Sequence, residues 1–282
     1  MSKRDVGPMA LTWSRRRFAG ISVDLTGGLG NQLFGFAAGW TQARRLGVPL
    51  GLRHRRRPGE TRRSFALEWL LDPPQVAMCS RPPRSTFREH SFAYDPAVDA
   101  VEPGTRLVGY FQSWRYSNAY AEGLRTYLFE HGLVLAQETD PFIAVHARRG
   151  DYLGARQMAF HGVCQEDYYI NGVRELRAML GDIPTRVFSD DVAFGQQLAA
   201  HIPDAAVGGD VGPAEQVLAQ MAQARGLVIS NSSFSWWAAW LAGTSATVIA
   251  PTPWFSDPAM PTEDLLPPSW LVRPRTEPSE VA

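Results

Sequence analysis

The chain repeats one pattern: a short apolar run, then a polar loop, then a helix-like segment. This order is the feature of the sequence that most restricts the possible folds. The strand-like runs cover residues 21–25, 107–113, 141–147, 185–191, 226–230 and 246–250. Helix-like segments cover 31–47, 164–180, 213–225 and 234–243, and the first ends at Gly47, a residue type common just after helices. Strands that alternate with helices indicate an α/β protein with parallel sheets.

A boundary between two halves is expected near residues 137–140, just before the strand-like run 141–147. It separates a first domain at 20–138 from a second domain at 139–282, after a basic tail at 1–19. Each domain then begins with a strand that leads into an unusual loop, and ligands bind at such strand ends in open α/β sheets. Two halves that face each other would therefore form a central cleft.

Two other stretches carry less information. Residues 51–106 are rich in Arg and Pro and show no pattern that predicts secondary structure. Residues 253–282 are rich in Pro, and we expect them to wrap the surface.

The loop TGGLGNQLFG at 26–35 follows the first strand and approaches two nucleotide-binding motifs without matching either. A dinucleotide fingerprint that starts at Gly28 needs glycine where Leu33 stands, and a P-loop that starts at Gly30 needs lysine directly after Gly35. Its glycines nevertheless allow backbone N–H groups to approach a ligand, and Asn31 lies where an anion-favouring helix begins. The alternative is a plain turn with an asparagine cap.

The sequence VHARRGDY at 145–152 places dense charge at the end of an apolar strand. Arg148 and Arg149 are adjacent, so on a strand they would face opposite sides. We expect one of them to pair with Asp151 and the other to point into the cleft and bind phosphate. The alternative is a purely structural Arg–Asp network, because such networks also concentrate charge. The embedded RGD tripeptide is too short to indicate integrin binding.

A third loop lies in GLVISNSSFSWWAAWLAG at 226–243, between a strand and an apolar helix. Asn231, Ser232 and Ser233 stand at the helix start, where hydroxyls and free amides would form a second phosphate cradle. The alternative is that Ser or Asn only caps the helix. The WWAAW run is apolar on all sides, so Trp236, Trp237 and Trp240 are predicted to be core residues rather than a sugar platform.

Composition excludes several classes of protein. Lys+Arg and Asp+Glu both number 28, and a formal net charge of zero argues against a general nucleic-acid binder. The sequence contains no apolar run long enough for a membrane span. Cys79 and Cys164 are too few for a disulfide scaffold, which favours a reducing compartment.

The basic tail at 1–19 lacks the apolar region of a secretory signal. It is expected to be a frayed terminus or a weak docking element for an anionic membrane surface. These features together predict a cytoplasmic protein, with peripheral membrane contact as a variant of that expectation.

Four motifs in a fixed order resemble one family. GGLGNQLF, HARRGDY, FSDD and SNSSFSWWAAWL are similar to the motifs of the alpha-1,2-fucosyltransferase family, glycosyltransferase family 11. GYFQSWRY, FHGVCQEDYY and APTPWF agree with this resemblance, which spans roughly residues 20–270. The resemblance implies a GT-B-like arrangement of two Rossmann-like domains around a cleft, with residues 20–138 on the acceptor side and residues 139–282 on the GDP-fucose side. It also implies inverting, metal-independent transfer of L-fucose from GDP-fucose to the 2-hydroxyl of a galactose residue in a glycan, without a cofactor.

The resemblance assigns roles to named residues. Arg148 would hold the β-phosphate of GDP, braced by Arg149 and Asp151, and the catalytic set would be Arg148, Asp151 and Asn31. The residues implied to lie along the donor are Gly28, Asn31, His146, Arg148, Arg149, Asp190, Asp191, Ser232, Ser233 and Phe234.

Charge on the leaving GDP needs a stabilising group, and the chain lacks the Asp-x-Asp pair that holds a metal in other transferases. An arginine supported by amide and hydroxyl donors would serve instead. The general base is left open among Asp151, His161 and Asp24.

The sequence also departs from the family. Val217 stands where many relatives carry an acidic residue, and Val192 stands where a tryptophan often follows FSDD. Both changes bear on which nucleotide base the donor site accepts. Two alternatives therefore remain: a related nucleotide-sugar transferase with a different donor or linkage, and a non-catalytic glycan- or nucleotide-binding protein.

Overall fold

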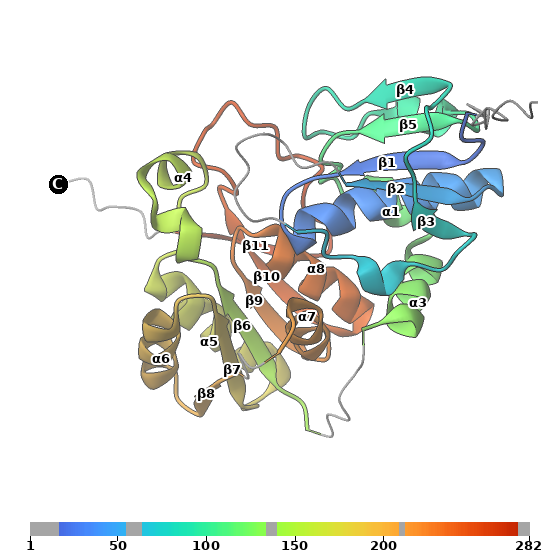
Figure 1. Cartoon of the computed structure of the whole chain (residues 1–282). Helices are drawn as coiled ribbons and strands as arrows, with labels where there is room; N and C mark the ends of the chain where they lie inside the picture. Colours follow the sequence, from blue (N-terminus) through green and yellow to red (C-terminus); the bar gives the residue numbers. More distant parts are fainter. Residues whose placement is uncertain (1–16, 55–63, 134–139, 209–211, 276–282) are drawn as a thin grey trace, which may run out of the picture.

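The computed structural model describes residues 17–54, 64–133, 140–208 and 212–275. They form two domains, each built on a parallel sheet with helices packed against it (Figure 1). The N-terminal sheet has the strand order β3-β2-β1-β5-β4, and the C-terminal sheet has the order β11-β10-β9-β6-β7-β8. The α/β class, the parallel sheets and the GT-B-like pairing of two Rossmann-like domains are confirmed. The boundary near 137–140 falls largely outside the described residues and stays a prediction.

The strands of the N-terminal domain are β1 (Ile21–Leu25), β2 (Leu50–His54), β3 (Val76–Met78), β4 (Ser85–Arg88) and β5 (Thr105–Val108). Those of the C-terminal domain are β6 (Ile143–Ala147), β7 (Thr185–Ser189), β8 (Ala205–Val207), β9 (Gly226–Ile229), β10 (Thr247–Thr252) and β11 (Leu271–Pro274). The central strands β1, β6 and β9 are almost entirely buried. Strands covered on both faces are continuous apolar runs, which is why the sequence predicts them.

The helices are α1 (Leu29–Leu46), α2 (Arg115–Asn118), α3 (Ala121–His131), α4 (Ala155–Phe160), α5 (Glu166–Leu180), α6 (Val192–His201), α7 (Ala214–Met221) and α8 (Ser233–Ala242). The predicted helices correspond to α1, α5, α7 and α8, and Gly47 ends α1 in a left-handed conformation with φ of 64°. Among the described residues, we find no helix with both the length and the apolar character needed to cross a membrane.

The predicted strand at 107–113 is wrong beyond Val108, where β5 ends. The chain turns at Phe111, whose φ is 54°. The carboxylate of Glu89, just beyond β4, accepts the N–H groups of Tyr110 and Phe111 at 2.7 and 2.9 Å. These bonds replace the ladder bonds of a strand, so the turn depends on a residue distant in the sequence.

The expectation for residues 253–282 needs a correction. Part of this segment, Leu271–Pro274, is the edge strand β11, which pairs in parallel with β10. The basic tail lies outside the described residues except for its last part, residues 17–19.

The two domains meet where α1 and α8 pack together (Figure 1). The ring of Phe34 in α1 lies 4.5 Å from the ring of Trp236 and 5.2 Å from that of Trp237, centroid to centroid. Trp236, Trp237 and Trp240 are buried, which confirms their prediction as core residues. One continuous apolar cluster includes residues from both domains, so their relative position is set by core-like packing.

Candidate functional site

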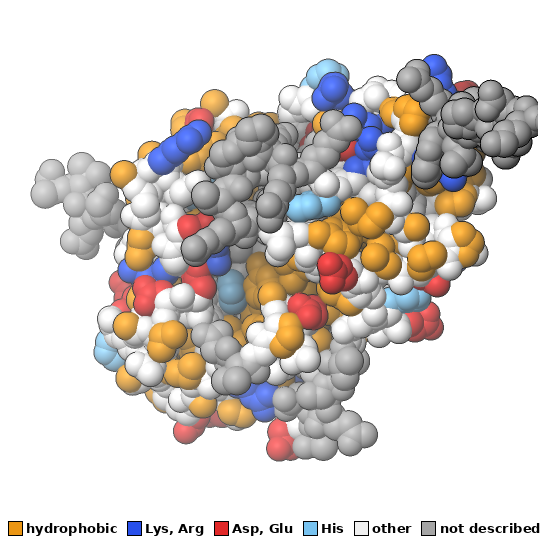
Figure 2. All heavy atoms as spheres, viewed as in Figure 1, with side chains coloured by type: hydrophobic (Ala, Val, Ile, Leu, Met, Phe, Trp, Pro, Cys, Tyr) orange, Lys and Arg blue, Asp and Glu red, His pale blue; other side chains and the backbone are white. Residues whose placement is uncertain are grey.

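A cleft of about 1380 Å³ lies between the domains and is lined by residues from both. In Figure 2, hydrophobic side chains are recessed in the hollow between the two lobes. The volume exceeds the roughly 300–1,000 Å³ common for a site that holds one small molecule. The cleft therefore has room for two substrates side by side.

The N-terminal wall of the cleft is the start of α1. The helix begins after Gly28, and no side chain among the described residues caps it. Its first residues line the cleft, so first-turn N–H groups and the positive end of the helix dipole face the space. Asn31 is not the cap, because its Oδ1 accepts a hydrogen bond from Gln112 Nε2 at 2.9 Å. This bond leaves the amide nitrogen of Asn31 as the group that can reach a ligand.

The start of α8 faces the same space from the C-terminal domain. Ser232 caps the helix, and its Oγ accepts the N–H of Phe234 at 3.3 Å. Ser232, Ser233 and Phe234 all line the cleft. Helix capping and a phosphate cradle are therefore compatible at this helix start. The hydroxyl of Ser232 caps the helix, and the first turn of α8 still lines the cleft.

Gly30 is the point where the two helix starts touch. A Cβ added there would lie 2.5 Å from the carbonyl carbon of Ser233 and 2.6 Å from the nitrogen of Phe234. Glycine is required because backbone meets backbone across the domain interface. The close approach places two helix N-termini together at one anion-favouring position.

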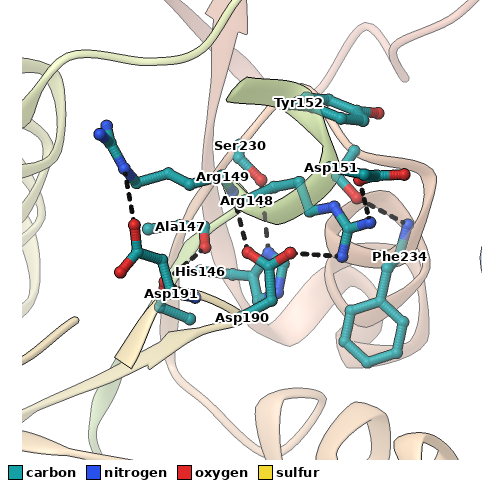
Figure 3. Close-up of polar contacts among 12 residues, drawn as sticks. His146, Ala147, Arg148, Arg149, Asp151, Tyr152, Asp190, Asp191, Ser230 and Phe234 are labelled. Carbon is teal, nitrogen blue, oxygen red and sulfur yellow. Dashed lines mark hydrogen bonds and ion pairs between the residues drawn. The ribbon is translucent and has the colours of Figure 1, made fainter. Parts of the chain in front are cut away.

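Arg148 extends into the cleft directly beyond β6 (Figure 3). Its guanidinium pairs with Asp151 Oδ1 at 2.5 Å and with Asp190 Oδ2 at 2.7 Å. Tyr152 lies under the guanidinium, with its ring centroid 5.5 Å away. Two carboxylates and one ring thus fix the orientation of the planar fork.

Arg149 points to the opposite side, as the sequence predicts, but its partner differs from the expected one. It pairs with Asp191 Oδ2 at 3.3 Å and lies 4.1 Å from the ring centroid of Phe194. We expected one arginine to pair with Asp151 and the other to enter the cleft. In the structure Arg148 pairs with Asp151 and also lines the cleft, and Arg149 pairs with Asp191.

Asp190 and Asp191 diverge at the end of β7. Asp190 lines the cleft, and it accepts the backbone N–H of Arg149 at 2.8 Å in addition to its pair with Arg148. Asp191 caps α6 by accepting the N–H of Phe194 at 3.1 Å. Arg149 and Asp191 pair with each other and are not among the residues that line the cleft, so their expected place along the donor stays a prediction.

His146 lies at the base of the cleft. Its Nδ1 shares hydrogen bonds with Ser235 Oγ at 2.5 Å and Ser230 Oγ at 3.3 Å. Burial, and secondarily the charge of Arg148, lowers the pKa of His146 to about 3. The imidazole is therefore neutral near pH 7, and it anchors the first turn of α8 rather than adding positive charge.

The three candidate bases are not equivalent. Asp151 and His161 line the cleft, and the His161 ring stacks on Tyr152 at 4.3 Å. Asp24 is not among the residues that line the cleft, and its carboxylate pairs with Arg106 and Arg53 on the N-terminal sheet. Asp24 is therefore removed from the candidates.

Within the part of the chain that the structure describes, no group of three or more His, Cys, Asp or Glu side chains is placed to hold a metal ion. At the end of β7, Asp190 pairs with Arg148 and Asp191 pairs with Arg149.

The cleft also contains residues that sequence reasoning did not single out. They are Phe92, Tyr110, Gln112, Tyr152, Arg156, Gln157, Phe160 and Phe255. Several belong to the stretches GYFQSWRY, FHGVCQEDYY and APTPWF, which carried the resemblance without assigned roles. Phe92 gave no signal, because it lies in the Arg- and Pro-rich region that shows no periodicity.

Comparison with known proteins adds a family match to this geometry. Residues 108–273, more than half of the chain, match the family described as Glycosyl transferase family 11. The chain is 29% identical over 291 residues to the alpha-1,2-colitosyltransferase of Escherichia coli, covering 89% of this chain and 98% of that protein. It is 25% identical over 193 residues to galactoside alpha-(1,2)-fucosyltransferase 1 of Saimiri sciureus, covering 61% of this chain and 52% of that protein.

Among solved structures, that of the fucosyltransferase NodZ from Bradyrhizobium is similar with a TM-score of 0.46 and 12% identity. The similarity covers 79% of this chain and 92% of that chain.

The neutral His146 predicts a pH dependence of stability. As pH falls below 6.5, the unfolded chain gains a proton on this residue, whereas the folded chain does not until about pH 3. The free energy of unfolding must therefore decrease over this window, by about 2 kcal/mol between pH 7 and pH 5. Urea unfolding of the wild type and of His146→Asn, which retains a hydrogen-bonding group near Nδ1, measures the difference. Parallel pH profiles for the two proteins would show that His146 is not held neutral.

Proposed function

The chain belongs to glycosyl transferase family 11, and from this premise we propose that it is an inverting, metal-independent alpha-1,2-fucosyltransferase. It would move L-fucose from GDP-fucose to the 2-hydroxyl of a galactose residue in a glycan. The observation that carries this proposal is the convergence of Arg148 with the starts of α1 and α8 on one cleft. Fucosyl transfer leaves GDP as an anion, and all three groups favour negative charge at that place.

The charge balance requires more than Arg148. One guanidinium faces two carboxylates, Asp151 and Asp190, so this trio alone carries a net negative charge when all three groups are ionised. Each helix N-terminus contributes the equivalent of roughly +0.5 charge, and Arg156 adds a full charge to the cleft wall. We infer that the diphosphate binds beside the point where the two helix starts meet and receives directed N–H bonds from Arg148.

The proton from the attacking hydroxyl needs an acceptor on the far side of the sugar from the diphosphate. His161 suits this role better than Asp151, because Asp151 pairs with Arg148 on the diphosphate side, whereas the stacked ring of Tyr152 lies between His161 and Arg148. His161 would take the proton as the new glycosidic bond forms and the bond to GDP breaks. The donor is a substrate, and no cofactor enters this scheme.

A second candidate is transfer of colitose. The observation in its favour is the similarity to an alpha-1,2-colitosyltransferase along 89% of the chain. Colitose differs from L-fucose by the absence of one ring hydroxyl, so a few contacts to that hydroxyl would decide between the donors. A third candidate is non-catalytic nucleotide or glycan binding, to which the exchange at Val217 points. The cytoplasm is the proposed location, since nucleotide sugars are made there.

A donor assay tests the proposal. Purified chain is incubated with GDP-fucose or GDP-colitose and a panel of β-galactosides, and GDP release and the glycan product are measured with and without EDTA. We expect alpha-1,2-linked fucosyl product with GDP-fucose and unchanged rates in EDTA. Preference for GDP-colitose would support the second candidate, and GDP binding without turnover would support the third. A rate lost in EDTA and restored by Mn²⁺ would contradict metal independence.

The two arginines are expected to respond differently to lysine. Arg148→Lys loses the planar fork that meets two phosphate oxygens, so turnover should fall by roughly 100-fold or more while the fold persists. Arg149→Lys loses its contacts with Asp191 and Phe194 behind the cleft wall, so its main effect should be a lower melting temperature. Turnover and melting temperature are measured for both variants. An inactive but stable Arg149→Lys beside an active Arg148→Lys would reverse the assignment.

A further inference from the structure

Four rings form a continuous aromatic wall along one arm of the cleft: Phe92, Tyr110, Phe160 and Phe255. Phe92 stacks on Tyr110 at 5.7 Å with an interplanar angle of 19°. Phe255 joins the two domains, because its centroid lies 5.3 Å from that of Phe92 and 5.2 Å from that of Phe160. Both domains therefore contribute to a single aromatic surface inside the cleft.

The aromatic wall begins a short distance from Arg148. Tyr152 lies beside the guanidinium and stacks on His161, and the His161 ring is 5.8 Å from that of Phe255. A second arm of the cleft lies by β7 and α7 and contains Phe188, Ala214 and Val217. In Figure 1 these two elements are well separated from α4, the helix that carries Phe160 of the aromatic wall. Arg148 thus stands between two chemically different arms.

The two arms suit different ligands. The α7 arm combines one ring with small residues and backbone, which fits the flat faces of a nucleobase. The aromatic wall is instead bordered by Arg156, Gln157 and His161, whose polar groups can bond to several hydroxyls. A pyranose has one C–H face that packs on rings and an edge of hydroxyls that needs such partners.

Tyr110 is held in position before any ligand arrives. Glu89 accepts the N–H groups of Tyr110 and Phe111, and Phe111 adopts the left-handed φ of 54°. A side chain on such a fixed turn loses little freedom when a ligand covers it. Tyr110 is nevertheless 40% exposed, so its ring is available to a ligand.

We propose that the aromatic wall is the acceptor subsite and binds the pyranose that receives the transferred sugar, by stacking its C–H face on Tyr110, whose ring Phe92 supports. This inference rests on the proposed function, because the acceptor must lie on the Arg148 side of the wall to reach the donor. It assigns the α7 arm to the nucleotide base and the aromatic wall to the glycan.

The test compares two tyrosines of nearly equal exposure. Tyr110 is 40% exposed and lies in the cleft, whereas Tyr120 is 38% exposed and is absent from the cleft wall. Tyr110→Ala should raise the KM for a β-galactoside acceptor about tenfold, in line with the loss of one stacked ring. The Kd for GDP should stay at the wild-type value. Tyr120→Ala should leave both constants unchanged, and Tyr110→Phe, which keeps the ring, should restore the acceptor KM.

Phe92→Ala provides a second variant, and melting temperatures establish that each protein is folded. An unchanged acceptor KM in both folded Tyr110→Ala and folded Phe92→Ala would overturn the inference. A weaker Kd for GDP in Tyr110→Ala would also overturn it, because the base would then occupy the wall. Failure of the proposed function is separate: wild-type protein would neither bind GDP nor transfer sugar.

Discussion

The contact of Gly30 with the backbone of Ser233 and Phe234 is the constraint on which the site depends. It brings the starts of two helices from different domains to one position, with no side chain between them. Phe34, Trp236 and Trp237 pack behind this contact and fix it in a common core. Partial positive charge at both helix ends is then a permanent feature of the cleft and needs no ionised side chain.

Arg148, in the cleft, has its orientation fixed by neighbouring side chains. Asp151 and Asp190 hold its guanidinium from two sides, which fixes geometry at the cost of net charge. The helix starts compensate for that negative charge. The two carboxylates therefore orient the guanidinium, and the helix starts supply the attraction for an anionic ligand. His146 supports this division, because its lowered pKa keeps it neutral while it anchors α8 through Ser235.

The sequence predicts the parts of the molecule that depend on local pattern. Buried parallel strands such as β6 and β9 are apolar runs, and the opposite directions of Arg148 and Arg149 follow from their adjacency. The pairing of Arg149 with Asp191 was not predictable, because it depends on β7 lying next to β6. Short, exposed β4 and the turn at Phe111 were also missed, since a distant carboxylate, Glu89, sets the turn.

The central claim is that the two helix starts form the diphosphate site. Calorimetric titration of GDP into the Gly30→Ala variant, which measures the Kd for GDP, tests it most directly. The added Cβ must push the start of α1 away from the start of α8, so GDP should bind at least about tenfold more weakly. Gly123→Ala, in α3, is the matched control, because its Cβ would meet only the tip of the Trp40 side chain at 3.3 Å. It should bind GDP as the wild type does. A folded Gly30→Ala protein with wild-type affinity for GDP would contradict the claim that the two helix starts form the diphosphate site.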